Sequence, residues 1–246
     1  MYINIKITLS MVILLVVLAL TGCTSNTTNA VIFDPYEQNN RKIHSFNKSL
    51  DKTLLRPASN TYAAIIPEPV ITGVSNFSSN LELPVMILNN LLQLDLEGAS
   101  TNTGRFLINS SVGLIGIFDI ASSLQIFGKN TDFNETLYTY GIGEGAYTEL
   151  PFFSSNTERS SAGLVLNFAV NPYKGVFTGA RDIIPVSAKI LDLMGKRHKY
   201  SDAIEGVLYE SDDSYAQSRQ IYLERMRFNL KGKLDDRVYE DPYESD

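Results

Sequence analysis

The chain contains few of the residues from which catalytic, metal or disulfide sites are built. Its 246 residues include one cysteine, two histidines and no tryptophan. A single cysteine excludes a disulfide within the chain, and paired cysteines for a metal are absent. The G-x-S-x-G, H-E-x-x-H and Walker A patterns are absent as well. We therefore expect no enzymatic activity, no metal and no cofactor.

Long apolar runs are also missing after the N-terminal segment. Beyond Cys23 even long uncharged stretches such as residues 106–118 and 160–173 fall short of the roughly 20 residues of a spanning helix. The formal net charge is −6, whereas a general nucleic-acid binder carries a basic face. The sequence therefore indicates neither a membrane-spanning helix after Cys23 nor a nucleic-acid partner.

The N-terminal segment has the pattern of a bacterial lipobox. One positive charge at Lys6 precedes the apolar run 11–20, and small residues ending at Gly22 come directly before Cys23. We expect residues 1–22 to be a lipoprotein signal peptide, cleaved between Gly22 and Cys23. Cys23 is then the lipid attachment site, because several acyl chains anchor a protein stably. A buried structural cysteine behind an ordinary signal peptide is the alternative.

The remaining chain divides by composition into three parts. Residues 23–33 are mostly polar and small, which is typical of a tether. Residues 34–230 carry helical apolar patterns and form the expected folded domain. Residues 231–246 are rich in charge with little apolar periodicity, which predicts a disordered tail. Thr24 follows the anchor, and by the sorting convention of bacterial lipoproteins it favours the periplasmic face of the outer membrane.

The first helix is expected to begin at Asp34. With Asp34 at the N-cap, Pro35 takes the first helical position and Glu37 the third, as in a capping box. Apolar residues then recur at helical spacing, at positions 43, 46, 50 and 54. Because the residue before a proline avoids the α region, we expect this helix to end before Pro57.

Proline and aspartate mark the next helix boundaries. A second helix is expected after Pro67, and Pro84 is expected to begin a third. Asp95 is expected to cap a fourth helix that runs through Asn109. The apolar, glycine-interrupted stretch 113–119 then predicts a bend or a close helix approach.

The segment from Tyr138 to Pro151 breaks the helical pattern. Aromatic and β-branched residues surround a glycine-rich centre at Gly141, Gly143 and Gly145. Such a composition predicts a β-hairpin. The expected fold is therefore mostly α-helical with one short β-hairpin.

Two helices are expected near the C-terminus. The first covers about residues 185–194 and should end at Gly195. The basic run Lys196–Lys199 beyond it is typical of a solvated helix end, although it could also contact anionic lipid headgroups. The second is a long charged helix over about 213–230.

A series of local motifs carries a family resemblance. In chain order the motifs are Asp34-Pro35-Tyr36-Glu37, Asn40-Arg41, Phe46-Asn47, Leu55-Arg56-Pro57, Pro67-x-Pro69, Gly73-x-x-Asn76-Phe77, Asn80-Leu81-x-x-Pro84, Arg105-Phe106-x-x-Asn109, Gly113-x-x-Gly116-x-x-Asp119 and Tyr140-Gly-x-Gly-x-Gly-x-Tyr147. Behind a lipobox and in this order, they resemble the MlaA (VacJ) lipoproteins. The departures from the family pattern are Ile71, Leu94, Ala146 and Ser214.

The resemblance implies a ring of amphipathic helices that lies in the outer membrane beside a trimeric porin. It also implies an amphipathic channel, through which mislocalised phospholipid leaves the outer leaflet for a periplasmic lipid carrier. Transport of this kind maintains lipid asymmetry and breaks no bond, so the chain needs neither a nucleophile nor a metal.

The resemblance also suggests roles for particular residues. Lys189 is a candidate channel or headgroup residue, a solvated surface lysine being the alternative. The candidate gating residues are Gly113, Gly116, Tyr140 and Tyr147. Motif residues expected to hold the structure together, chiefly by locking helix ends and crossings, are Asp34, Pro35, Asn40, Arg41, Asn47, Asn76, Asn80, Arg105, Asn109 and Asp119.

Two other functions stay open at this stage. A structural lipoprotein that escorts a porin could have the same composition. A lipid hydrolase would need a Ser-His-Asp arrangement, for which only Ser45 with His44 or His198 is available, and no motif supports it.

Overall fold

The structure is a computed structural model that describes residues 32–170 and 183–238. Helices dominate these residues, and the strands described in them form one antiparallel pair, which confirms a mostly α fold with one short β-hairpin. The elements are α2 Glu37–Leu50, η1 Asp51–Leu55, α3 Arg56–Ile65, α4 Glu68–Leu92, α5 Leu96–Ser111, α6 Ile120–Ser123, α7 Phe133–Thr139, β1 Tyr147–Leu150, β2 Ser154–Thr157, α8 Glu158–Ala169, α9 Ile183–Lys199, α10 Ser201–Glu205, η3 Gly206–Glu210 and α11 Ser214–Val238.

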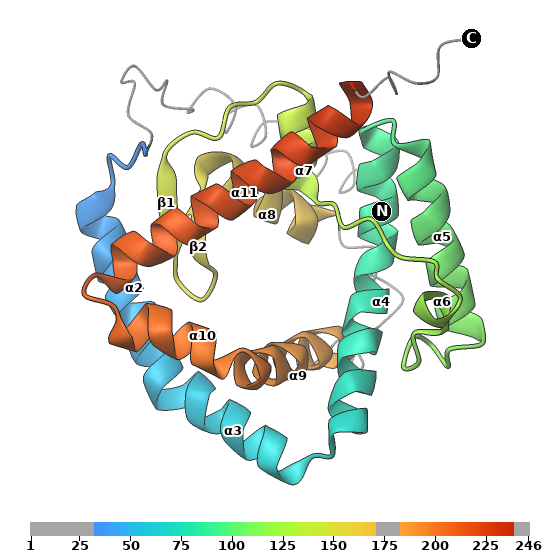
Figure 1. The fold of residues 1–246 in the computed structure, drawn as a ribbon, viewed down its shortest axis with the longest axis horizontal. Coiled ribbons are helices and arrows are strands. Elements are labelled where there is room, and N and C mark those ends of the chain that lie inside the picture. Colours follow the sequence, from blue (N-terminus) through green and yellow to red (C-terminus); the bar gives the residue numbers. More distant parts are fainter. Residues whose placement is uncertain (1–31, 171–182, 239–246) are drawn as a thin grey trace, which may run out of the picture.

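The helices are arranged as a ring (Figure 1). Helices α2, α3 and α4 follow one another around the perimeter, and α11 returns from the α2 side toward the end of α4. Helix α9 packs against both α3 and α4, while α5 covers α4 from the other side. The buried apolar cluster is small and lies at the α11 side of the ring, where it contains Tyr147, Tyr215, Leu223, Met226 and Leu230.

The start and the end of the first helix differ from expectation. Tyr36, not Asp34, is the N-cap of α2, and no side chain caps it. Helix α2 does not stop before Pro57 but continues through a π turn into α3, where the N–H of Arg56 donates to the carbonyl of Asp51. A π turn shifts the pairing by one residue, so it can accommodate the missing N–H of the proline without ending the helix.

Two further predicted boundaries lie inside helices. Pro84 interrupts the hydrogen bonds of α4, which nevertheless runs from residue 68 to residue 92 with α5, α7 and α9 packed along it. Gly195 does not cap α9, which continues to Lys199. A Cβ at Gly195 would lie 2.9 Å from Cγ2 of Ile71, so the glycine permits a close crossing of α9 over α4. The predicted Asp95 cap is confirmed, since its side chain accepts the Gly98 N–H.

The β-hairpin lies later in the chain than predicted. Tyr138 belongs to α7, and the glycine-rich stretch is the loop from α7 to β1. The strands β1 and β2 pair in register from Tyr147↔Thr157 to Leu150↔Ser154. Positive φ angles occur at Phe152 (69°) in the connecting turn and at Ser154 (55°), the first residue of β2. Phenylalanine rarely adopts such an angle, so the sequence did not point to this turn.

Both ends of the predicted domain extend beyond its expected limits. Ile32 packs against the apolar cluster, and the carbonyl of Phe33 accepts the N–H of Tyr147, although both residues were assigned to the tether. Helix α11 continues to Val238, into the segment predicted to be a disordered tail. The signal peptide, Cys23 and residues 239–246 lie outside the described residues.

The glycine-interrupted stretch after α5 forms a tight turn. Its backbone enters the left-handed region at Leu114 (φ 51°), Ile115 (φ 61°) and Gly116 (φ 92°). A Cβ at Gly116 would lie 2.4 Å from Cβ of Asn80 on α4. Both the φ angle and this contact require glycine at position 116.

Replacing Gly116 by alanine should therefore destabilise the protein by about 1–3 kcal/mol, because strain and a clash act together. Unfolding of the full chain in detergent micelles measures the change. Gly104→Ala is the matched control, since Gly104 lies in α5 and a Cβ added there would meet nothing within 4 Å. That variant should gain about 0.5–1 kcal/mol. Equal stability of the two variants would contradict the role of Gly116.

Candidate functional site

Burial in this protein is inverted with respect to a soluble globule. Among the described residues, buried polar and charged side chains outnumber buried hydrophobic ones, and many large hydrophobic side chains are exposed. None of the described helices combines the length and the apolar character needed to cross a bilayer. An extended exposed apolar surface marks a site of contact with lipid or protein.

Much of the exposed apolar surface belongs to two segments. In the turn after α5 the exposed side chains are Val112, Leu114, Ile115, Ile117 and Phe118. On α9 they are Ile183, Ile184, Val186, Ile190 and Leu193. These exposed apolar side chains make the two segments the clearest candidates for an apolar contact surface. Elements that lie in a membrane interface likewise present one apolar face and one polar face.

Asn40 ties α2 to β1 and to the chain before α2. Its amide nitrogen donates to the carboxylate of Asp34 at 2.9 Å and to the carbonyl of Tyr147 at 3.1 Å, and its oxygen accepts an N–H of β1 at 3.0 Å. Asp34 also accepts from Tyr215 and Arg219 of α11. The Asp34 carboxylate therefore joins three parts of the chain instead of capping a helix.

His44 lies buried between α2, β1 and α11. Its Nδ1 is 2.9 Å from Oε1 of Glu149 and its Nε2 is 3.0 Å from Oγ of Ser214. This Ser-His-Glu order differs from the predicted hydrolase arrangement, because Ser45 donates to the carbonyl of Arg41 instead. His198, the other candidate base, has its Nδ1 3.2 Å from Asn60.

The surroundings of Ser214 do not suit a nucleophile. The adjacent carboxylate of Asp213 accepts the N–H of Ala216 at 3.0 Å, so a donor of the first turn of α11 that could stabilise an oxyanion is occupied. A cavity of about 290 Å³ is lined by His44 and Glu149, and Ser214 is not among its lining residues. The geometry supports a structural hydrogen-bond chain between elements.

The basic run Lys196–Lys199 is not simply a solvated helix end. Arg197 is buried, and it donates to both carboxylate oxygens of Asp51, at 2.7 and 2.9 Å, and to Glu205 at 2.7 Å. These hydrogen bonds raise the pKa of Arg197. Burial and a hydrogen bond to Asp51 raise the pKa of Tyr209 to about 12. The charged group joins η1, α9, α10 and η3.

Predicted motif residues meet where α4 and α5 face the following turn. Asn76 donates to the carbonyl of Ile117 at 3.1 Å, and Asn80 donates to the carbonyl of Ile115 at 3.3 Å. Asn109 donates to Asp119 at 2.9 Å. Each of these amides thus joins segments that are separate in the chain.

Asp119 is an ion-pair partner as well as a helix cap. It caps α6 through the N–H of Ser122 and pairs with Arg105, whose Nη2 lies 3.0 and 3.1 Å from its two carboxylate oxygens. Burial disfavours the charged form of Asp119, but the hydrogen bonds from Ser122, Asn109 and Arg105 outweigh it and lower the pKa. The carboxylate is therefore held ionised.

A second amide group includes Asn90 and Asn102, which do not belong to the matched motifs. Asn102 of α5 donates to Asn90 of α4 at 2.8 Å and to the carbonyl of Lys129 at 2.9 Å. Thr136 of α7 donates to Asn89 at 2.7 Å. All three asparagines are fully buried. The recurrence of asparagine in the segments that form α4 and α5 was the only sequence feature that pointed to this group. Asparagine is also common in exposed turns, so the recurrence did not identify buried positions.

The remaining predicted residues have separate environments. Lys189 is exposed and pairs with Glu82 of α4. Tyr140 is exposed and donates to the carbonyl of Leu92 at 2.9 Å, whereas Tyr147 is buried. Asn47 joins α2 to the hairpin by donating to the carbonyl of Leu150 at 3.0 Å. Their suggested functional roles stay predictions.

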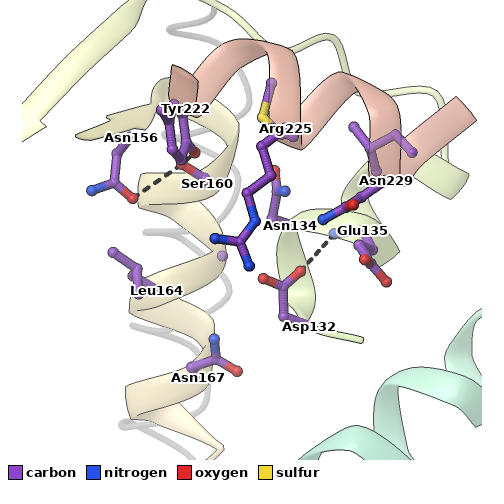
Figure 2. A pocket seen from close by; sticks show the side chains of 13 residues that line it. Asp132, Asn134, Glu135, Asn156, Ser160, Leu164, Asn167, Tyr222, Arg225 and Asn229 are labelled. Atoms are coloured by element: carbon purple, nitrogen blue, oxygen red, sulfur yellow. Dashed lines mark hydrogen bonds between the residues drawn. The ribbon is translucent and has the colours of Figure 1, made fainter. Parts of the chain in front are cut away.

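A polar pocket of about 300 Å³ lies between α7, α8 and α11 (Figure 2). Its lining residues are Asp132, Asn134, Glu135, Asn156, Ser160, Gly163, Leu164, Asn167, Tyr222, Arg225, Met226, Asn229 and Leu230. The sequence did not indicate this pocket, because its residues come from three separate segments. Among the described side chains, no group of three or more His, Cys, Asp or Glu residues is placed to hold a metal.

Comparison with known proteins decides the family. A model of the family described as MlaA lipoprotein matches residues 32–229. The chain belongs to the MlaA lipoprotein family. The family resemblance carried by the sequence motifs is therefore confirmed.

Two relatives that carry the name MlaA match most of the chain, and a third, uncharacterized relative matches part of it. The Haemophilus influenzae protein named intermembrane phospholipid transport system lipoprotein MlaA is 30% identical over 230 residues, which is 90% of each chain. The Escherichia coli protein of the same name is 31% identical over 218 residues, which is 87% of this chain and 85% of that one. An uncharacterized Rickettsia felis protein is 37% identical over 142 residues, and the match spans 57% of its length.

A solved structure shares the fold. It comes from work described as "Structural basis for maintenance of bacterial outer membrane lipid asymmetry". The TM-score is 0.67 and the identity 27%, over 80% of this chain and 98% of the other. The helical ring of this chain is therefore an arrangement with a solved counterpart.

Removal of the buried Arg197 should destabilise this MlaA-family protein strongly. Arg197→Met leaves the buried carboxylate of Asp51 without its main partner, which costs about 3–5 kcal/mol of unfolding free energy. Arg56→Met is the control, because Arg56 makes a more exposed pair with Glu205 and should cost about 1 kcal/mol or less. Denaturant unfolding in detergent micelles compares them, and similar losses would contradict the assignment.

The pair between Arg41 and Asp213 should make stability depend on acid pH. Arg41 donates to both oxygens of Asp213, at 3.0 and 2.8 Å, and lowers the pKa of Asp213 from 3.8 to about 2. Since the folded-state pKa is the lower one, this stabilisation is present above pH 3.8 and is lost as the pH falls through about 2. Solvent screening of the exposed pair limits it to about 1 kcal/mol.

Melting temperatures between pH 2 and pH 5 test this dependence. Asp213→Asn should flatten the pH profile, whereas Asp212→Asn on the neighbouring exposed residue should leave it unchanged. An unchanged profile in Asp213→Asn would show that the ion pair does not couple protonation to folding.

Proposed function

We propose that this protein is an outer-membrane lipoprotein that passively removes mislocalised phospholipid from the outer leaflet and passes it to a periplasmic carrier. Cys23 anchors it at the periplasmic face, and a trimeric porin is its neighbour in the membrane. The proposal is supported most directly by the distribution of side chains: many large hydrophobic ones are exposed, and polar ones are buried where elements meet. An apolar exterior of this kind suits a ring that lies in lipid. Two relatives named as phospholipid transport lipoproteins give the proposal its substrate class.

Passage of a phospholipid requires two environments at once. Moving a charged headgroup into hydrocarbon costs several kcal/mol, whereas the acyl tails avoid water. A passage with polar groups on one side and apolar groups on the other lowers both costs. No covalent bond changes in such a step, so the protein acts on lipid without catalysis.

Particular residues have proposed parts in this passage. Lys189 offers a cation to the lipid phosphate, and its pairing with Glu82 would then open when lipid binds. Gly113, Gly116 and the exposed Tyr140 belong to the proposed gate. Tyr147 was a gating candidate too, but it is buried against α11, so we assign it a fixed position beside the gate.

Deletion of the gene, followed by measurement of phospholipid in the outer leaflet, tests the proposed function. We expect surface phospholipid to rise, and the wild-type chain to restore it. Cys23→Ala should fail to restore asymmetry because the anchor is lost. Lys189→Asp should fail as well, while Lys52→Asp changes the charge equally at an exposed position of η1 and should restore it.

Vesicles that contain the purified protein and porin separate transport from a structural role. Lipid transfer to a soluble acceptor that depends on the protein supports the proposal. Porin binding without lipid transfer would instead support the alternative of a lipoprotein that escorts a porin. Release of fatty acid from the lipid would support a hydrolase.

A further inference from the structure

The pocket between α7, α8 and α11 contains an arginine, Arg225, that has no partner among the described residues. Arg225 points into it, as Figure 2 shows. Within the described part of the chain, Arg225 makes no hydrogen bond or ion pair. Other arginines nearby are neutralised: Arg219 by Asp34 and Arg227 by Glu144. Arg225 is exposed, and none of its donors is used by the described residues, so they can reach a ligand.

Acceptors and amides surround this guanidinium. Asp132 borders the pocket and accepts one hydrogen bond, from the N–H of Glu135 at 2.9 Å. The amides of Asn167 on α8 and Asn229 on α11 also line it, and neither makes a described hydrogen bond. One cation, one carboxylate and two neutral amides thus face the same space from three helices.

The charges favour a ligand that carries both signs. The carboxylate of Asp132 borders the pocket beside the guanidinium of Arg225. A free phosphate would gain one partner, Arg225, and be repelled by the carboxylate of Asp132. A phosphate joined to an amine would place its negative part on the arginine and its positive part on a carboxylate, so that both charges are paired.

We propose that this pocket binds the zwitterionic phosphoethanolamine headgroup of a phospholipid. Arg225 donates to the phosphodiester oxygens, Asp132 accepts from the ammonium group, and Asn167 and Asn229 bind the remaining oxygens. A volume of about 300 Å³ holds a headgroup but not two acyl chains, which stay outside. This inference rests on the proposed function, because it gives the transported lipid its headgroup class.

Calorimetric titration of the full chain in detergent micelles tests the proposal. The probes are glycerophosphoethanolamine, glycerophosphoglycerol and inorganic phosphate. Arg225→Gln should weaken the ethanolamine probe at least about tenfold, because a charge-assisted contact is lost. Asp132→Asn should weaken that probe similarly but not glycerophosphoglycerol, and asparagine keeps the N-cap of α7. Lys52→Gln and Asp212→Asn are the charge-matched controls.

Circular dichroism verifies that each variant is folded. If Arg225→Gln does not fold, Asn229→Asp gives the same readout, because a second carboxylate beside the arginine repels the phosphate. Absence of glycerophosphoethanolamine binding to the wild-type chain overturns the proposal, and so does equal binding by the variants and the controls. The proposal is also overturned if inorganic phosphate binds as tightly as glycerophosphoethanolamine and Asp132→Asn changes neither affinity. The pocket is then a simple anion site.

Vesicle transfer assays separate this inference from the proposed function. Lipid transfer by a wild-type chain that does not bind glycerophosphoethanolamine overturns the headgroup pocket and leaves the transport function standing. Headgroup binding by a chain that transfers no lipid supports the pocket and overturns the transport function.

Discussion

The ring depends on hydrogen bonds between buried amide or carboxylate side chains and groups of neighbouring elements. Asn40 connects α2 to β1, Asn80 connects α4 to the turn after α5, and Asn102 connects α5 to α4. A buried polar group without a partner costs more than its hydrogen bond contributes, so these contacts specify one arrangement of the helices. The small apolar cluster alone would not specify it.

The same constraint explains why the exterior is apolar. Where helices are joined through polar groups, their hydrophobic residues are left to face outward, as the exposed turn after α5 and the exposed face of α9 do. In contact with lipid tails, helix association gains little from the hydrophobic effect and relies on close packing and hydrogen bonds. The close crossing at Gly195 and the buried amides follow that rule.

Two groups of buried charged residues, one around Asp34 and one around Arg197, connect different parts of the ring. Asp34, before the start of α2, binds Tyr215 and Arg219 of α11, whereas Arg197 binds Asp51, just after the end of α2, and Glu205. The charges of Arg197 and Arg219 are thus satisfied within the protein. Arg225, by contrast, has no partner among the described residues and lines a pocket.

The sequence by itself determined the family, the mostly helical class, the cap at Asp95 and the residues of the amide motifs, since each depends on local spacing. Only the tertiary structure decided which partners those residues bind. Pro57, Pro84 and Gly195 have strong local preferences for helix ends, yet packing of neighbouring helices outweighs them. Likewise, Arg197 is buried and Arg225 exposed although both are arginines on charged helices, because burial depends on segments distant in the chain.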